Sequence, residues 1–276
     1  MTARKQKTES LLVRVGEHVL SAFAYVGGMT MLLASAIAWA GRGLVSKKTP
    51  FRTEALAEQM IRVGIKSLGI VMLVQLFIGI IIALQMEPAL AEWGQQAMVA
   101  DVIGVAGYRM LGPMITAVVL SGFAGASIAA EIGTMVVSEE IEALEATALN
   151  PVRFLVVPRV FATLIMMVLL TIVADLMISL GGYLAAVLVL GPTVYQGYWT
   201  RMSSFLQFSD FYTGLVMSAV FGVLISIIAC HEGLRVKGGA EGVGKATTMT
   251  VVYSIVAIIL AAVVFTAIFY VFVWRV

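Results

Sequence analysis

The segment SGFAGASIAAEIGTMVVSEEIEALEATALNPVRFLVVPR, residues 121–159, sets the interpretation of the whole chain. It begins in one long apolar run and ends in another. Between these runs lie five of the chain's sixteen acidic residues: Glu131, Glu139, Glu140, Glu142 and Glu145. A short acidic segment between two such runs is typical of a loop that joins two membrane spans.

Apolar spacing predicts a short amphipathic helix inside this loop. Residues that line one helical face recur at intervals of 4, 3 and 4 positions: Val137, Ile141, Leu144 and Ala148. Two interpretations fit this pattern. The helix is either a handle by which another protein grips the membrane domain, or a helix that merely lies on the membrane surface.

The ends of this helix carry recognisable signals. Ser138 is expected to cap its start, with Glu139 and Glu140 in the first turn, where the helix dipole favours anions. Asn150 followed by Pro151 is expected to end it, because the residue before a proline avoids the α region.

The overall composition is that of an integral membrane protein. The 276 residues are 61% hydrophobic and 12% charged, whereas a soluble domain carries about 25% charged residues. The single cysteine, Cys230, excludes an internal disulfide and a cysteine metal cluster. We therefore predict an all-α, multi-pass membrane protein that forms a single domain over residues 1–276.

Six apolar runs are long enough to be considered as spans, since about 20 residues cross the hydrocarbon core. They are residues 19–40, 67–86, 102–130, 156–190, 211–230 and 249–273. The fourth run is long for one span and too short for two. A single helix that tilts or extends beyond the bilayer is expected there.

Basic residues predict the orientation, because cytoplasmic loops are enriched in them. Fifteen of the eighteen are placed on the cytoplasmic side if the run 19–40 does not cross: Arg4, Lys5, Lys7, Arg14, Arg42, Lys47, Lys48, Arg52, Arg62, Lys66, Arg153, Arg159, Arg235, Lys237 and Lys245. If that run crossed, one basic cluster before the second run would face the wrong side.

We therefore interpret 19–40 as an interfacial or re-entrant helix. Residues 1–60 form a cytoplasmic tail with this helix, and residues 61–276 form a five-span core. The amino terminus is then cytoplasmic, and the carboxyl terminus, with Arg201 and Arg275, lies on the outer side. The alternative is six spans with the amino terminus outside. Aromatic residues are expected at the outer interface: Trp93, Tyr195, Tyr198, Trp199 and Trp274.

Three charged residues lie in or beside the spans, where each needs a partner or a wet cavity. Arg109 either binds an anionic head group at the outer mouth, or snorkels to the interface or pairs within the protein. Asp175 is either a proton relay or a structural hydrogen-bond acceptor between helices. Glu131, at the cytoplasmic end of its span, is expected to stay solvated or to cap nearby backbone.

A stripe of small residues, Ser121, Gly125 and Ala129, recurs every four positions in the third run. Such stripes let another helix approach closely, so we predict a packing role. The partner helix is either from the same chain or from another.

Residues 238–247 resemble a phosphate-binding loop but fail its requirements. From Gly239 the sequence matches GxxxxGK, yet Ala246 stands where a magnesium-binding hydroxyl is needed. The glycines are expected to permit a tight turn instead. No catalytic triad, metal-ligand set or haem motif is present in the sequence, so we predict neither an enzyme nor a nucleic-acid-binding protein, and no cofactor on this chain.

Several motifs together resemble the MlaE/YrbE-type permeases, the membrane subunits of lipid-moving ABC transporters that work with MCE-domain proteins. They are SGFAGASIAAEIGTMVVSEEIEAL, NPVRFLVVPRVFA and GLRVKGGAEGVGKATTMTVVYS, and the resemblance covers roughly residues 50–276. It implies a homodimer in the bacterial inner membrane, each chain with an interfacial amino-terminal helix and five spans. It also implies two separate cytoplasmic ATPase subunits, which hold the ATP and magnesium, and a hexameric MCE-domain ring on the periplasmic side.

The resemblance also assigns candidate residues. FIG followed by ALQ matches Phe77, Ile78, Gly79, Ala83, Leu84 and Gln85, and the RELGP pattern matches Arg109, Leu111, Gly112 and Pro113, with Met110 in place of the acid. The loss of that acid suggests a more apolar or more anion-selective mouth. With these matches, we expect a lipid to bind at Ile82, Leu84, Gln85, Leu90, Trp93 and Arg109.

The family's coupling helix falls on residues 134–150. ATPase coupling is accordingly assigned to Glu131, Thr134, Glu139, Glu140, Glu142, Leu144 and Arg159. The expected function is an ABC transporter permease that moves lipids, with phospholipids as the favoured class. Two alternatives remain: a proton-coupled secondary transporter that uses Asp175, and a membrane scaffold without transport.

Overall fold

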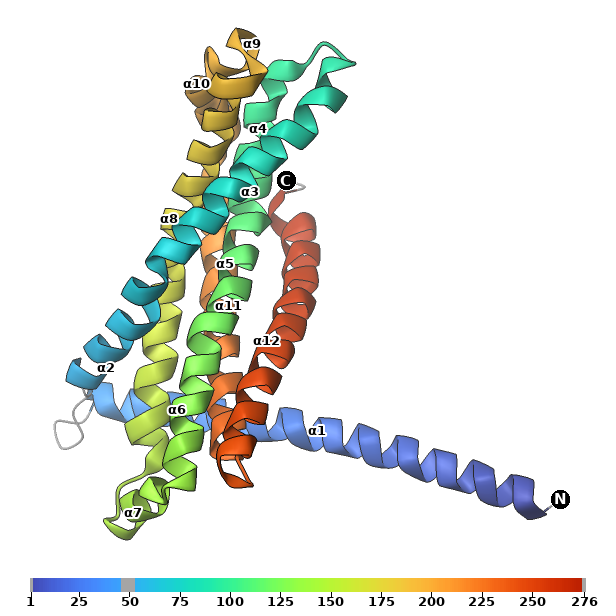
Figure 1. Ribbon diagram of the computed structural model, residues 1–276, viewed down its shortest axis with the longest axis vertical. Coiled ribbons are helices and arrows are strands. Elements are labelled where there is room, and N and C mark those ends of the chain that lie inside the picture. The colour runs from blue at the N-terminus through green and yellow to red at the C-terminus, as the bar shows by residue number, and fades with distance from the viewer. Residues whose placement is uncertain (1, 46–52, 275–276) are drawn as a thin grey trace. The chain divides into compact units, whose positions relative to one another are not determined.

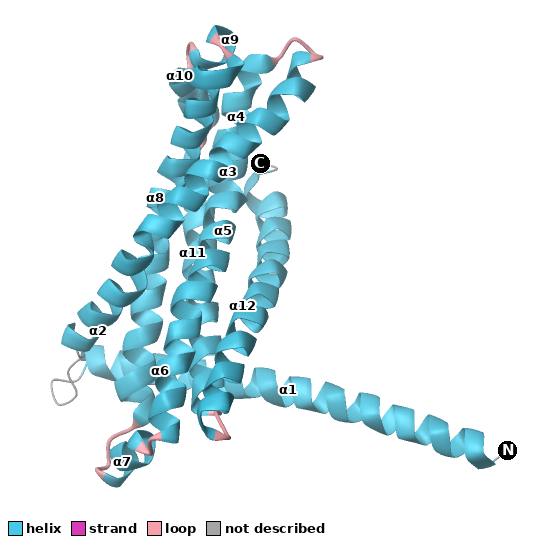
Figure 2. Ribbon diagram, viewed as in Figure 1, coloured by secondary structure: helices cyan, strands magenta, loops and turns pink. Residues whose placement is uncertain are grey.

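The computed structural model of the protein describes residues 2–45 and 53–274. Every regular element in these residues is a helix (Figure 2). By length and composition, six of the described helical stretches can cross a membrane. The predicted all-α membrane fold is therefore confirmed. Among the basic residues used for the predicted orientation, Lys47, Lys48, Arg52 and Arg275 lie outside the described residues.

Internal contacts divide the chain into two units, Met1–Phe51 and Arg52–Val276. The first unit contains α1 (Thr2–Val45), which is one uninterrupted helix. Its stretch Phe23–Arg42 has the length and hydropathy of a span. Because an interfacial helix can have the same composition, the interfacial position of this helix stays a prediction.

The second unit is a bundle of five long helical stretches, several of which contain a π-helical turn (Figure 1). The first stretch, Thr53–Ala91, contains α2 (Thr53–Met60) and α3 (Lys66–Ala91), and the second, Gln96–Val137, contains α4 (Val99–Ala106), α5 (Gly112–Leu120) and α6 (Ala126–Val137). The third, Val152–Leu190, contains α8 (Val157–Ala185). The fourth, Phe208–Leu234, is α11, and the fifth, Gly239–Trp274, contains α12 (Gly239–Phe269).

Short helices lie at the two ends of this bundle. The helix α7 (Glu140–Ala146) lies at one end, and α9 (Pro192–Tyr195) and α10 (Tyr198–Phe205) lie at the other (Figure 1). The stretch Val152–Leu190 has 39 residues and is therefore roughly 58 Å long at 1.5 Å per residue. It exceeds a hydrocarbon core of about 30 Å, which confirms the single long helix expected there.

Glycines bring α3 and α8 into backbone contact. A Cβ atom at Gly79 would overlap the carbonyl oxygen of Ile178, and one at Gly181 would overlap that of Leu76. Small residues at such a crossing allow the close van der Waals packing that holds membrane helices together. The helix α11 then packs against α5, α6, α8 and α12 and forms the centre of the bundle.

The outer faces of α3 and α12 are apolar. Leu73 and Phe77 on α3, and Leu260 and Val263 on α12, are each more than half exposed. Exposed apolar faces of this kind are expected where a helix meets lipid or a second copy of the chain.

The turn before α12 uses two glycines in the left-handed region, Gly238 with φ 88° and Gly239 with φ 70°. Glycine adopts these angles without a steric penalty, which confirms the predicted tight turn. Residues 239–247 are not a loop, however, because they form the first turns of α12.

Of the aromatic residues expected at the outer interface, Tyr198 is an exception, because its side chain is buried. Its hydroxyl donates to the carbonyl oxygen of Ser179 over 3.1 Å. Burial raises the pKa of Tyr198, so the hydroxyl keeps the proton that it donates. Trp93, by contrast, is 80% exposed.

Candidate functional site

A cavity of about 400 Å³ lies between α4, the turn that follows it, and the end of the α12 stretch. Its polar residues are Asp101, Arg109 and Thr266. The rest of the lining is apolar: Met98, Val102, Val105, Ala106, Met110, Phe205 and Trp274. A cavity with these walls suits an apolar chain better than a polar solute.

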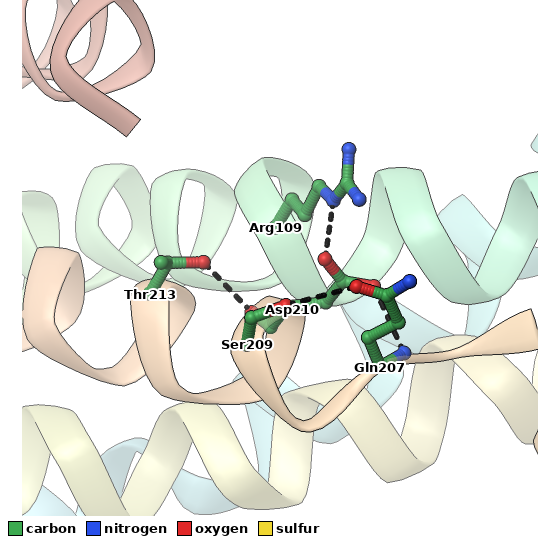
Figure 3. Close-up of polar contacts among 5 residues, drawn as sticks. All are labelled: Arg109, Gln207, Ser209, Asp210 and Thr213. Atoms are coloured by element: carbon green, nitrogen blue, oxygen red, sulfur yellow. Dashed lines mark hydrogen bonds and ion pairs between the residues drawn. The ribbon is translucent and has the colours of Figure 1, made fainter. Parts of the chain in front are cut away.

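The π-helical turn Gly107–Leu111 carries Arg109 into this cavity. Turns of this kind are frequent at functional sites. The side chain of Arg109 extends toward α11, where its Nε donates to Oδ1 of Asp210 over 2.6 Å (Figure 3). The arginine side chain is 28% exposed, whereas that of Asp210 is 1% exposed.

Asp210 is held in place by the start of its own helix. Its Oδ2 accepts the backbone N–H of Gln207 over 3.1 Å, and the side chain of Gln207 caps the helix in return (Figure 3). Thr213 donates its hydroxyl to the carbonyl oxygen of Asp210. A carboxylate from another helical stretch thus lies beside Arg109, although Met110 follows it in the sequence.

Trp274 completes the surroundings of the guanidinium. The Arg109 Cζ atom lies 4.5 Å from the centre of the Trp274 ring, a favourable cation–π arrangement. Among the described residues, no hydrogen bond holds either Nη atom of Arg109. An apolar cavity with a cation that retains free donors can bind an amphiphile with an anionic group.

The candidate lipid-binding residues of α3 and of the turn after it do not join this cavity in a single chain. Ile82 and Leu90 pack against the chain's own core, while Leu84, Gln85 and Trp93 are exposed. The structure brings Arg109 together with Met110 and not with α3. A pocket that contains both groups stays a prediction for a two-chain assembly.

At the opposite end, the acidic segment is not one helix over residues 134–150. The helix α6 ends at Val137, and α7 begins at Glu140, because Glu139 has a left-handed φ of 59°. The prediction that Ser138 caps the second helix is wrong. Its hydroxyl donates to the carbonyl oxygen of Thr134 and to Glu140, so it closes the end of α6.

The expected stop at Asn150 and Pro151 is also wrong. The helix α7 ends at Ala146, and Ala148 has a left-handed φ of 57°. Asn150 instead accepts the backbone N–H of Arg153 over 3.2 Å, so it belongs to the start of the next helix.

The side chains assigned to coupling fall into two groups. Those on the loop are open to a partner: Glu139, Glu140 and Glu142 are exposed, and Leu144 is half-buried. Thr134 is exposed at the end of α6, and its hydroxyl donates to the carbonyl oxygen of Ala130. The second group, Glu131 and Arg159, is engaged inside the bundle.

Glu131 joins three helical stretches through two ion pairs. Its Oε2 lies 2.6 Å from Nη1 of Arg62, and its Oε1 lies 3.0 Å from Nη2 of Arg159. The side chain of Glu131 is 28% exposed, so it keeps part of the expected solvation, but packing also places two guanidinium groups beside it, which the sequence did not predict. Arg159 is 4% exposed and also donates to the carbonyl oxygen of Leu155, so it offers little surface to a partner.

We expect Glu131→Gln to destabilise the protein by about 1–3 kcal/mol, because the buried Arg159 would lose its charge partner. The melting temperature of the detergent-solubilised chain measures this effect. Glu145→Gln is the matched control, since Glu145 is exposed on α7. Equal melting temperatures for the two variants would contradict a structural role for the ion pairs.

The stripe of Ser121, Gly125 and Ala129 packs within the chain. Ser121 and Ala129 are fully buried, and a Cβ atom at Gly125 would lie 3.2 Å from Ile225 on α11 and 3.5 Å from Thr250 on α12. The small side chains thus sit where α11 and α12 approach α6 and the turn before it.

Asp175 is 1% exposed in α8, and neither carboxylate oxygen has a hydrogen-bond partner among the described residues. The interpretation of this residue as an interhelical acceptor has no support in these contacts. Its Oδ1 lies against the backbone of Gly112, where a Cβ atom would overlap it.

Sequence reasoning missed two charge pairs in the half of the bundle that carries α9 and α10. Asp210 pairs with Arg109, and Asp101, which is 3% exposed, accepts Nη2 of Arg201 over 3.0 Å. The available signal was the rule that a charge in a span needs a partner, but it does not identify the partner.

Comparisons with known proteins show which family this chain is similar to. The family model described as Permease MlaE matches residues 56–268. A probable ABC transporter permease protein of Rickettsia typhi is 36% identical over 214 residues, which cover 78% of this chain and 82% of the relative. A similarly named protein of Synechocystis is 36% identical over 206 residues, or 74% and 77% of the two chains.

A plant relative is similar to the same part of the chain. The chloroplast protein TRIGALACTOSYLDIACYLGLYCEROL 1 of Arabidopsis thaliana is 33% identical over 213 residues, which cover 77% of this chain and 61% of the relative. The match to the family model spans most of the bundle described above. This multi-pass membrane protein therefore belongs to the MlaE permease family.

Proposed function

We propose that this chain is the permease subunit of an ABC transporter that moves lipids, with phospholipids as the favoured substrate class. The observation that carries the proposal is the apolar cavity at Arg109, in which a cation with free Nη donors lies beside an almost wholly apolar wall. A lipid offers the complementary pair of groups, a phosphate and acyl chains. Each methylene removed from water contributes about 0.8 kcal/mol.

The proposed assembly contains two copies of this chain, two cytoplasmic ATPase subunits and a hexameric MCE-domain protein. Names of relatives support the ATPase, since several are probable ABC transporter permeases. The name of the Arabidopsis relative contains that of a galactolipid, which supports a lipid substrate. ATP and magnesium would be held by the ATPase and not by this chain.

The proposed location is the bacterial inner membrane. The α7 end faces the cytoplasm, together with the amino terminus, and the end with α9 and α10 faces the periplasm, together with the carboxyl terminus. The ATPase then meets the exposed acids of α7, and closure of its dimer moves α6 and opens or squeezes the lipid cavity. The ion pairs of Glu131 connect α6 to the starts of α3 and α8, so they would transmit this movement.

Purification of the chain with its native neighbours, followed by reconstitution in liposomes, tests the proposal. We expect an ATPase to co-purify and lipid transfer to an acceptor to require ATP hydrolysis. Full transfer without an ATPase would contradict the proposal and favour a secondary transporter. A co-purifying ATPase that never turns over would instead favour a scaffold.

The proton-relay alternative rests on the buried Asp175. We expect Asp175→Asn to leave ATP-driven transfer unchanged and the melting temperature unchanged or higher, because it replaces a buried carboxyl group that has no hydrogen-bond partner among the described residues. Asp101→Asn is the matched control, since it weakens the Arg201 pair and should lower the melting temperature. If the Asp175→Asn protein folded but lost lipid transfer, that result would support the proton-relay alternative.

A further inference from the structure

A second cavity, of about 230 Å³, lies at the α7 end of the bundle. One wall comes from the stretch Thr53–Ala91 where α2 passes into α3, and the other comes from the turn Ser121–Gly125 and α6. Its polar lining consists of Gln59, Arg62, Lys66 and Ser127. This cavity shares no lining residue with the one at Arg109.

The charge of this cavity favours an anion. Arg62 and Lys66 are one helical turn apart, so both reach the same wall. Arg62 is engaged with Glu131, which also binds Arg159. Among the described residues, Lys66 has no ion pair. Arg62, Lys66 and Arg159 carry three positive charges, and Glu131 carries one negative charge. The excess of positive charge is one that a phosphate can offset.

The cavity also presents an unused acceptor. Gln59 is 7% exposed, and its Oε1 has no hydrogen-bond partner in the described part of the chain. A buried acceptor without a donor costs about 1–3 kcal/mol. A ligand that satisfies it must bring an N–H or O–H group in addition to its anionic group.

The apolar part of the lining indicates the source of the ligand. Phe123 is 40% exposed, whereas Val63 and Ile128, which also line the cavity, are buried. These side chains belong to stretches with the hydropathy of membrane spans. A lipid, which joins a phosphate to apolar chains, matches this mixture of basic and apolar lining better than a free anion does.

We propose that this cavity binds the head group of a glycerophospholipid that carries a hydrogen-bond donor, such as an ethanolamine or glycerol head group. The phosphate lies against Lys66 and Arg62, and the ammonium or hydroxyl donates to Oε1 of Gln59. That the bound lipid belongs to the cytoplasmic leaflet rests on the proposed function. The contacts of the head group with Lys66, Arg62 and Gln59 do not depend on it. The site is a second lipid position, separate from the transport cavity at Arg109.

Native mass spectrometry of the full chain in detergent tests the proposal. The probes are phosphatidylethanolamine and phosphatidylcholine with identical acyl chains, because the quaternary choline has a phosphate but no N–H donor. We expect the ethanolamine lipid to bind about fivefold to tenfold more tightly at one site, as one additional charge-assisted hydrogen bond implies.

Two variants separate the two contacts. Lys66→Gln should weaken both lipids about tenfold, and Gln59→Leu should abolish the preference between them while it leaves phosphatidylcholine binding unchanged. Lys245→Gln is the matched control, because Lys245 is an exposed lysine of α12 that does not line the cavity. Variants that bind both lipids like the original protein would overturn the site.

Two further measurements test this site independently of the proposed transport function. Displacement of the lipid by inorganic phosphate at equal concentration would show that the cavity takes a free anion, and would overturn the lipid assignment. The measurement needs no ATPase, so its failure leaves the transport test unaffected. In the Arg109→Ala background, Lys66→Gln should remove a second, separate lipid adduct, and no additional loss would contradict two independent sites.

Discussion

Reversal of the three exposed acids Glu139, Glu140 and Glu142 to lysine is expected to reduce ATP-driven lipid transfer at least about a hundredfold. All three lie at the start of α7, and each is exposed. A partner surface that complements these carboxylates would meet like charges instead, which costs several kcal/mol. Because the ATPase supplies the energy, a permease that cannot engage it should not transport.

The fold should survive this triple change. The acids make no ion pair within the described residues, and lysines in the first turn of a helix cost about 0.3–1 kcal/mol each through the helix dipole. Transfer in liposomes and ATPase co-purification are the two measurements. The glutamine version of the triple change is the control, since it removes the negative charge without reversing it and should retain part of the activity. Wild-type transfer by the lysine version would refute the role of α7 in coupling.

Arg109→Ala is expected to lower the phospholipid that co-purifies with the protein by about tenfold or more. Among the described residues, the change removes the only cation that lines the cavity at Arg109, and a charge-assisted contact to a phosphate is among the stronger polar interactions. It also leaves the carboxylate of Asp210 buried without its partner, so the melting temperature should fall as well. Lipid mass spectrometry and thermal unfolding measure the two effects.

Two further variants distinguish lipid binding from stability. Arg109→Ala combined with Asp210→Ala removes both charges, so it should recover much of the stability but not the lipid. Glu131→Gln should destabilise the protein by the loss of its pairs with Arg62 and Arg159, which lie outside this cavity, while it keeps the lipid at Arg109. If the double variant recovered the lipid together with stability, Arg109 would have no place in the site.

Much of the helical framework could be predicted, because the length of an apolar run can be read directly from neighbouring residues in the sequence. The run 156–190 became the helix Val152–Leu190, and 211–230 became part of Phe208–Leu234. Boundaries at the acidic loop were predicted less well. Left-handed residues at Glu139 and Ala148 end the helices there, and no local residue type announces such a conformation for glutamate or alanine.

The sequence by itself determined that the chain is an all-α membrane protein, which segments are apolar enough to span, and that charges within a span, such as Arg109, need a partner or a wet cavity. These conclusions follow from the free energy of burying polar groups in a hydrocarbon core. Only the tertiary structure decided which partners they have. Arg109 meets Asp210 across 101 positions of the chain, and Glu131 meets Arg62 and Arg159. Helix packing brings distant residues together through close contacts such as the one at Gly79, and such contacts leave no periodic pattern along the chain.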